Sequence, residues 1–269
     1  MRNRQVIGLG RTAEILVWKK NQVLKLFRDD WSLSAVKWEE KVARTVSEAG
    51  LPVPAVYGIV EVDGRHGIVY DRVDGPSMLK ELLSKPGKLE HFAGLFAELH
   101  ADIHSVKVEK LPSQHQRLKE KICNAKPLTN DLKQAALKVL NNLPDDNVLC
   151  HGDFHPDNIL MTSKGSIIID WNDATKGVPE ADISRTLLLL QKGQPPYPLK
   201  LDLEEGSSIR TQFIKHYLKR YSKIRSISIE DVKSWQLPVI AARLSEGIKE
   251  EKSDLLSILK TLVQHHETE

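Results

Sequence analysis

The stretch from Cys150 to Leu160, CHGDFHPDNIL, places several ionisable side chains between apolar residues. Within it, Asp153 stands five positions before Asn158. An Asp carboxylate can accept the proton of a hydroxyl, and an Asn across a compact loop can offer a neutral oxygen to Mg²⁺. The spacing therefore predicts chemistry at a hydroxyl beside a metal ion. The alternative interpretation is a polar surface turn.

A second carboxylate follows the next apolar run, SIIIDW, which predicts a strand over 167–170. Asp170 ends that run, twelve residues after Asn158. A lone Asp at the end of a strand is usually a turn residue. Because this one follows the first motif so closely, we interpret it as a second metal ligand.

The N-terminal segment 6–28 predicts three short strands, with breaks at a glycine pair and at a polar turn. Gly8 and Gly10 in the first break allow backbone N–H groups to approach phosphates, and Lys25 in the third strand can reach phosphate oxygens. Each signal is weak alone, because such glycines are often plain turn residues and a strand lysine often points to solvent.

Residues 34–49 predict a helix, with Ser32 and Ser34 as candidate N-caps and a stop at Gly50. At 100° per residue, one apolar face has Glu39 near its centre, whereas Glu40 lies toward the edge. The apolar members of that face are Ala35, Val42, Ala43 and Val46. A buried Glu requires a partner, and we predict Lys25. If the register is misjudged, both Glu side chains are exposed.

The remaining pattern predicts an α+β protein of two parts. Two more strands, 55–62 and 67–71, precede an Asp-Gly-Pro turn, and helical periodicity then dominates. We therefore expect an N-terminal part over 1–75 and a mainly helical part over 76–269. In the second part we expect a short strand at 148–150 and a proline-containing loop at 191–206.

The composition excludes several classes of protein. The chain has 269 residues and a net charge of +3 from 39 basic and 36 acidic residues, without a basic tail or stripe for nucleic acid. No apolar run approaches the ~20 residues of a membrane span, and no secretory leader is evident. We therefore expect a cytoplasmic protein. Cys123 and Cys150 are interpreted as reduced residues.

His100 and His104 share a helix face at i, i+4 and invite a zinc-site interpretation. The Glu of a metalloprotease helix is missing, and the sequence offers no obvious third ligand. We therefore interpret both as packing residues.

Taken together, these motifs resemble the aminoglycoside phosphotransferase/choline kinase-like family, small-molecule kinases with the protein-kinase fold. The resemblance covers most of the chain and rests on HGDFHPDNIL, IIIDWNDATKGVPEADISRT, IGLGRTAEI with VLKLF, EAGLPVPAVYGI and YDRVDGPSM. It implies a two-lobed fold with a nucleotide-binding N-lobe and a C-lobe for catalysis and acceptor binding. It also implies ATP and Mg²⁺ as cofactors and a small-molecule alcohol as acceptor.

The resemblance also assigns roles to individual residues. It makes Asp153 the catalytic base, Asn158 and Asp170 the Mg²⁺ ligands, Lys25 the phosphate clamp held by Glu39, and Asp71 to Val73 the hinge that pairs with adenine. Asp182 and His151 become structural supports. Trp235, Arg243 and Glu246 lie where the family usually completes its acceptor pocket, although core packing is the alternative. The sequence departs from the protein-kinase pattern with Ala13 in place of a third glycine and Asp-Trp-Asn in place of Asp-Phe-Gly.

Two other functions remain to be weighed. A protein kinase is disfavoured because only nine residues separate Asp170 from Glu180, too few for an activation segment. A regulatory pseudokinase is disfavoured because the four residues of the expected phosphoryl-transfer set are all present. The acceptor stays open among aminoglycoside-, choline- and sugar-like alcohols.

Overall fold

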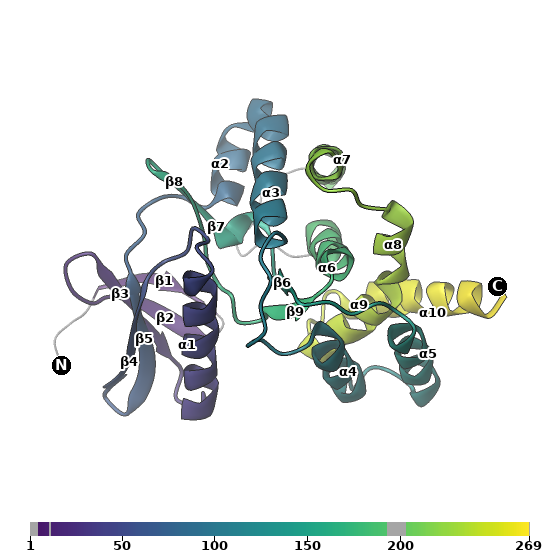
Figure 1. The fold of residues 1–269 in the computed structure, drawn as a ribbon, viewed down its shortest axis with the longest axis horizontal. Helices are drawn as coiled ribbons and strands as arrows, with labels where there is room; N and C mark the ends of the chain where they lie inside the picture. Colours follow the sequence, from purple (N-terminus) through teal and green to yellow (C-terminus); the bar gives the residue numbers. More distant parts are fainter. Residues whose placement is uncertain (1–4, 11, 193–202, 269) are drawn as a thin grey trace. The chain divides into compact units, whose positions relative to one another are not determined.

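The computed structural model describes residues 5–10, 12–192 and 203–268 (Figure 1). The chain divides into two compact units. We call residues 1–84 with 156–173 the sheet unit, and residues 85–155 with 174–269 the helical unit.

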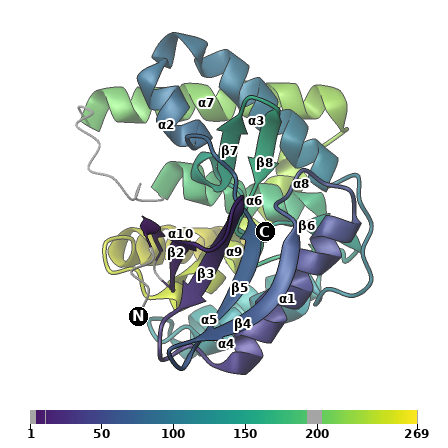
Figure 2. The same cartoon turned by 90° about the vertical axis from the view of Figure 1, so that its left-hand side faces the viewer.

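The sheet unit is built on an antiparallel five-stranded sheet with the order β1-β2-β3-β5-β4. Its strands are β1 Val6–Leu9, β2 Ala13–Val17, β3 Gln22–Phe27, β4 Val56–Val62 and β5 Arg65–Asp71. Helix α1, Leu33–Glu48, lies against β4 and β5 in Figures 1 and 2. Val36 of this helix packs with Phe27 and Ile68 of the sheet in one buried cluster. The expected strands and the expected helix are therefore present.

A side-chain cap fixes where helix α1 begins. Ser32 is the N-cap, and its hydroxyl accepts a hydrogen bond from the backbone N–H of Ala35. The buried side chains of the helix are Val36, Glu39, Val42 and Val46. The buried face thus includes Val36, whereas the expected members Ala35 and Ala43 are only partly buried.

The sheet unit continues beyond the boundary that we expected after Gly75. It includes α2, Met78–Ser84, and a later segment with the 3₁₀ turn η2 Pro156–Asn158 and the paired strands β7 Ile159–Thr162 and β8 Gly165–Ile168. The backbone N–H of Met161 donates to the carbonyl of Pro76 at 2.8 Å. A Cβ at Gly75 would lie 2.1 Å from the Met161 carbonyl oxygen, so only glycine permits this approach. These contacts explain why both segments belong to one unit.

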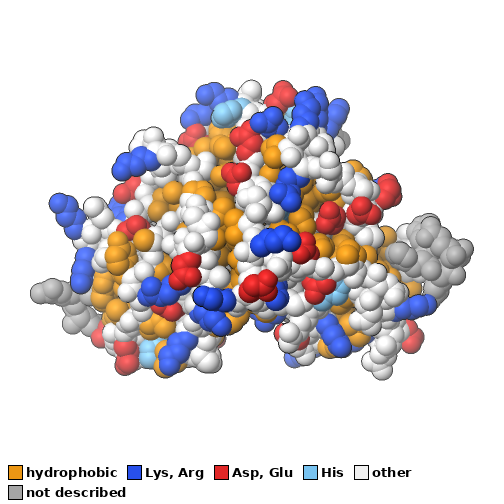
Figure 3. Space-filling view, in the orientation of Figure 1, with side chains coloured by type: hydrophobic (Ala, Val, Ile, Leu, Met, Phe, Trp, Pro, Cys, Tyr) orange, Lys and Arg blue, Asp and Glu red, His pale blue; other side chains and the backbone are white. Residues whose placement is uncertain are grey.

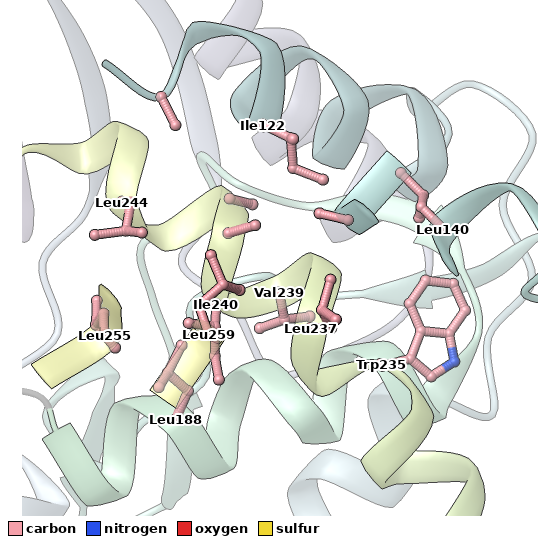
Figure 4. Packing of buried hydrophobic residues seen from close by; sticks show 14 of the residues in the cluster. Ile122, Leu140, Leu188, Trp235, Leu237, Val239, Ile240, Leu244, Leu255 and Leu259 are labelled. Carbon is pink, nitrogen blue, oxygen red and sulfur yellow. The ribbon is translucent and has the colours of Figure 1, made fainter. Parts of the chain in front are cut away.

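The helical unit packs around α9. Its elements are η1 Pro86–Lys88, α3 Leu89–Ile103, α4 Gln114–Asn124, α5 Asn130–Asn141, β6 Val148–Cys150, β9 Thr175–Gly177, α6 Pro179–Lys192, α7 Leu203–Ile224, α8 Ile229–Ser234, α9 Gln236–Arg243, η3 Leu244–Glu246 and α10 Lys252–Thr268. Figure 4 shows side chains of α9 among those of its neighbours. Residues such as Leu237, Ile240 and Leu259 are at most 5% exposed, and such burial is the main stabilising contribution to a core.

Some local expectations were wrong. The strand expected over 167–170 ends at Ile168, because Asp170 has a left-handed backbone, φ 63°, that cannot continue a strand. Strands β7 and β9 were not predicted. Both ends of the loop expected over 191–206 are helical instead, since α6 continues to Lys192 and α7 begins at Leu203. Its three prolines lie outside the described residues.

The surface carries charges of both signs. In Figure 3, Lys and Arg side chains are interspersed with Asp and Glu side chains on the face that is drawn. Among the described helices, none combines the length and the apolar character that crossing a bilayer requires.

Candidate active site

Lys25 is the centre of a charged cluster in the sheet unit. Its Nζ lies 2.8 Å from Glu39 Oε1 and 3.2 Å from Asp170 Oδ1. Burial alone would lower the pKa of Lys25, but the carboxylates of Asp170 and Glu39 outweigh it and raise the pKa. Lys25 is therefore a positive charge held between two acidic groups.

The structure pairs Lys25 with Glu39 and not with Glu40. The Glu39 side chain is 9% exposed, and burial raises its pKa although the neighbouring Lys25 opposes that rise. The Tyr70 hydroxyl on β5 also opposes the rise in the pKa of Glu39. Glu40 instead pairs with Arg44, one helical turn along the surface of α1. The helix register inferred from the apolar face is thus the observed one.

The two expected metal ligands are brought together by the β7–β8 pairing. Ile159 stands opposite Ile168, and the backbone N–H of Ile169 donates to the Asn158 carbonyl at 3.0 Å. Asn158 is 8% exposed, whereas the side chain of Asp170 is 44% exposed. Asn172 donates its side-chain amide to Asp170 Oδ1 at 2.9 Å. A carboxylate and an amide carbonyl are oxygen donors of the kind that Mg²⁺ prefers.

The expected phosphate loop and hinge lie on the same unit. Gly8 is in β1, and Gly10 donates its backbone N–H to the Ala13 carbonyl at 2.8 Å, which closes a tight turn. A Cβ at Gly10 would lie 3.2 Å from that carbonyl oxygen. Asp71 ends β5, where its carboxylate accepts a hydrogen bond from the Tyr57 hydroxyl at 2.7 Å, and Val73 follows two residues later.

Asp153 lies in the helical unit, in the loop after β6. Its Oδ2 is 3.6 Å from His155 Nε2, and its Oδ1 is 3.6 Å from Arg185 Nη2. Burial would raise the pKa of Asp153, but His155, Arg185 and His151 together hold it well below its ordinary range. Asp153 is therefore an ionised acceptor at neutral pH and a weak base.

One face of α6 holds this loop. Asp182 accepts the backbone N–H groups of His151 at 2.7 Å and Gly152 at 2.8 Å. Arg185 donates its Nε to the Gly152 carbonyl at 3.2 Å, and Thr186 donates its hydroxyl to the Phe154 carbonyl at 3.1 Å. Because the three α6 residues are at i, i+3 and i+4, a single helix face fixes the backbone around Asp153.

A row of alternating charges begins at Asp153 and continues within the helical unit. Arg185 Nη2 is 2.8 Å from Glu246 Oε1, and Glu246 also pairs with Arg243. Arg243 binds Glu251 with two nitrogens, each at 2.8 Å, in the bidentate geometry that favours Arg. The expected acceptor residues Arg243 and Glu246 are therefore linked to Asp153 through Arg185.

Trp235, the third expected acceptor residue, has different surroundings. It is 1% exposed and belongs to the apolar cluster of Figure 4. Its ring stacks edge-on against His115, with centroids 5.2 Å apart. This packing corresponds to the alternative interpretation of Trp235 as a core residue.

Three residues of this site were not predicted from the sequence, namely Arg185, Thr186 and Glu251. Arg185 and Thr186 follow Asp182 by three and four residues in the DISRT segment. In a helix this spacing puts all three residues on one face, and that was the available signal. Glu251 has no comparable signal, because it is one acidic residue in a charged run. The sequence offered no obvious third ligand for His100 and His104, but the structure places Asp182 with them.

We predict that Arg185→Met raises the pKa of Asp153, because the substitution removes a positive charge that stabilises the carboxylate. The acid limb of the pH–rate profile should then move to higher pH, in addition to any fall in the maximal rate. Arg185→Lys keeps the charge and should leave the limb closer to its original position. An acid limb at the same pH in the Met variant would contradict the electrostatic role of Arg185.

The model of the phosphotransferase enzyme family matches residues 5–222. No curated protein sequence matches the chain significantly.

Solved structures of similar fold are phosphotransferases and kinases. A thermostable mutant of aminoglycoside phosphotransferase APH(4)-Ia, in a ternary complex with AMP-PNP and hygromycin B, has a TM-score of 0.63 at 14% identity, covering 98% of this chain and 92% of that one. Amicoumacin kinase hAmiN, in complex with AMP-PNP, Ca²⁺ and amicoumacin, gives 0.61 at 15% identity, covering 98% and 88%. APH(3'')-Id from Streptomyces rimosus, with ADP and streptomycin, gives 0.55 at 16% identity, covering 89% and 92%.

At these identities the structural likeness establishes the fold, which is the protein-kinase-like α+β fold that we expected. The family model covers most of the chain, including both the Lys25–Glu39 pair and the loop that carries Asp153. The chain therefore belongs to the phosphotransferase enzyme family.

Proposed function

We propose that the protein transfers the γ-phosphoryl group of ATP to a hydroxyl group of a small molecule. The observation that carries the proposal is the way α6 holds Asp153: it binds the backbone of the neighbouring His151 and Gly152, and Arg185 lies 3.6 Å from the Asp153 carboxylate. In phosphoryl transfer the protein mainly positions groups and neutralises charge, and little covalent chemistry falls to its side chains. A rigidly held acceptor for a hydroxyl proton suits that task.

The residues of the sheet unit suit the nucleotide. Lys25, which Glu39 holds in place, would bind phosphate oxygens as a point charge, and Gly8 and Gly10 would let the backbone approach them. Asn158 and Asp170 supply the oxygen donors that Mg²⁺ prefers, and the ion would neutralise charge on the phosphates when bound. Asp71 and Val73 would pair with adenine through their backbone.

Asp153 would act on the acceptor. Its low pKa makes it a weak Brønsted base, so its main task is to orient the hydroxyl and to accept the proton late in the reaction. Arg185 would keep the Asp153 carboxylate ionised and fix its orientation, because Arg185 contacts both that carboxylate and the Gly152 carbonyl.

The acceptor is proposed as an aminoglycoside-, choline- or sugar-like alcohol. Support comes from the family and from the aminoglycosides and amicoumacin named with the similar structures. The test is ADP release from MgATP in the presence of a panel of alcohols, amino alcohols, sugars and antibiotics. ADP release that depends on one acceptor, with phosphate found on that acceptor, supports the proposal. Nucleotide binding without transfer to any acceptor would favour a pseudokinase.

We predict that Glu39→Gln lowers turnover, because Lys25 loses the charged partner that is 2.8 Å away. Glu40→Gln is the matched control on the same helix, since Glu40 pairs only locally with Arg44 and an exposed pair of this kind contributes little. We expect turnover to fall roughly 10-fold or more in Glu39→Gln and less than about 3-fold in Glu40→Gln. Equal losses measured by steady-state kinetics would contradict the role of Glu39.

A further inference from the structure

Two helices of the helical unit present matched pairs of aromatic residues to each other. His100 and His104 lie one turn apart on α3, and Tyr217 and Tyr221 lie one turn apart on α7. The two helices are side by side in Figures 1 and 2. His100 Nδ1 is 2.8 Å from the Tyr217 hydroxyl, and His104 Nδ1 is 2.7 Å from the Tyr221 hydroxyl. All four side chains are buried.

Both histidines converge on Asp182. Each Nε2 lies 3.2 Å from Asp182 Oδ2, and the carboxylate also accepts the backbone N–H groups of His151 and Gly152. The Asp182 side chain is fully buried. Burial would raise the pKa of Asp182, but the hydrogen bonds from the histidines hold it well below its ordinary range.

The hydrogen-bond chemistry fixes the proton positions. An ionised carboxylate only accepts, so each histidine must donate from Nε2. A neutral imidazole accepts at Nδ1, so at a neutral His100 the Tyr217 hydroxyl must donate. His100 is neutral because burial lowers its pKa to about 3. His104 and His151 lie beside it and oppose a further positive charge there.

We propose that the Tyr217–His100 and Tyr221–His104 pairs are positioning residues, which lock the Asp182 carboxylate in the orientation that holds the loop of Asp153. This inference rests on the proposed function, in which Asp153 orients the acceptor hydroxyl. Without the two Nε2–H donors, the described hydrogen-bond partners of the Asp182 carboxylate are only the backbone N–H groups of His151 and Gly152. The loop that the carboxylate holds would then be the only group that fixes its orientation.

A metal site is the competing interpretation of the same residues. The ligand atoms of His100, His104 and Asp182 lie within 4.8 Å of one another. The hydrogen-bond pattern opposes it, because a cation would have to displace both Nε2–H protons that Asp182 accepts. The backbone N–H groups of the loop already use the same carboxylate.

The test compares His100→Gln with His100→Met. The two side chains have similar length, but only Gln retains a donor near the Nε2 position. We expect the Gln variant to keep kcat within about 3-fold, and the Met variant to lose roughly 10- to 10²-fold in kcat with an unchanged KM for ATP, as for a slightly misplaced catalytic group. His91→Gln, an exposed histidine on the same helix, is the control that should leave kcat unchanged.

Two measurements test the positioning without relying on catalysis. In the wild type, ¹⁵N NMR should show His100 as the neutral Nε2–H tautomer and His104 with a proton on Nε2. Hydrogen exchange at the His151 and Gly152 amides should be slow. Exchange should stay slow in the Gln variant and become faster in the folded Met variant. Equal behaviour of the two variants, a charged or Nδ1–H His100, a His104 without a proton on Nε2, or a stoichiometric metal ion would overturn the inference. If the wild type transfers no phosphate to any acceptor, the proposed function fails, while the NMR and exchange results still decide the positioning.

Discussion

Asp153→Asn is expected to lower the rate of phosphoryl transfer by roughly 10²- to 10⁴-fold and to leave MgATP binding nearly intact. The substitution is almost isosteric, but the amide cannot accept the proton of the acceptor hydroxyl. The N–H groups of His151 and Gly152 still bind Asp182, so the loop keeps its backbone anchors. Single-turnover transfer and calorimetric titration with MgATP measure the two quantities separately.

Asp157→Asn is the matched control. Asp157 belongs to the same motif and lies in η2, but no role in transfer is assigned to it. This variant should therefore retain most of its activity. If Asp157→Asn abolished transfer while Asp153→Asn did not, the assignment of the proton acceptor would be wrong.

The choice between Glu39 and Glu40 shows what sequence periodicity can resolve. A helix presents every third or fourth residue to the core. A single acidic residue on such an apolar face is therefore expected to be buried and to pair with a positively charged side chain. Lys25 was predicted to lie in the third strand from a short β-prone run, and the antiparallel register sets it opposite Ile15 and Ile68. Local periodicity thus predicted a contact between residues that are fourteen positions apart.

Contacts that depend on how helices pack were beyond such reasoning. Arg185 is recognisable as a member of the α6 face only when Asp182 and Thr186 are known to meet the loop at 151–154. The pairing of His100 with Tyr217 joins residues 117 positions apart and has no local signature. The sequence separation of these partners explains why His100 was interpreted simply as a packing residue.

Short strands were the other failure. β7 and β9 have four and three residues, too few for alternation to be distinguished from a loop. Asp170 illustrates the consequence, because the apolar run before it predicted a strand that included it. Its left-handed backbone instead turns the chain directly after β8 and leaves the carboxylate exposed.

Asp170→Asn is expected to weaken MgATP binding by about 10-fold or more, because a neutral amide replaces a charged oxygen ligand on a hard cation. Without Mg²⁺, the effect of Asp170→Asn on the affinity for ATP should have the opposite sign. Asp170 then only repels phosphate and competes for Lys25, which it contacts at 3.2 Å. Metal-free ATP should therefore bind to the variant at least as tightly as to the wild type.

Asp63→Asn provides a control for the backbone. Asp63 also has a left-handed backbone, φ 51°, and it is exposed in the turn between β4 and β5. Since Asn tolerates this conformation well, neither substitution should disturb the fold, and only Asp170→Asn should change nucleotide binding. An equal loss of affinity with and without Mg²⁺ in calorimetry would show that Asp170 acts by positioning Lys25 and not as a metal ligand.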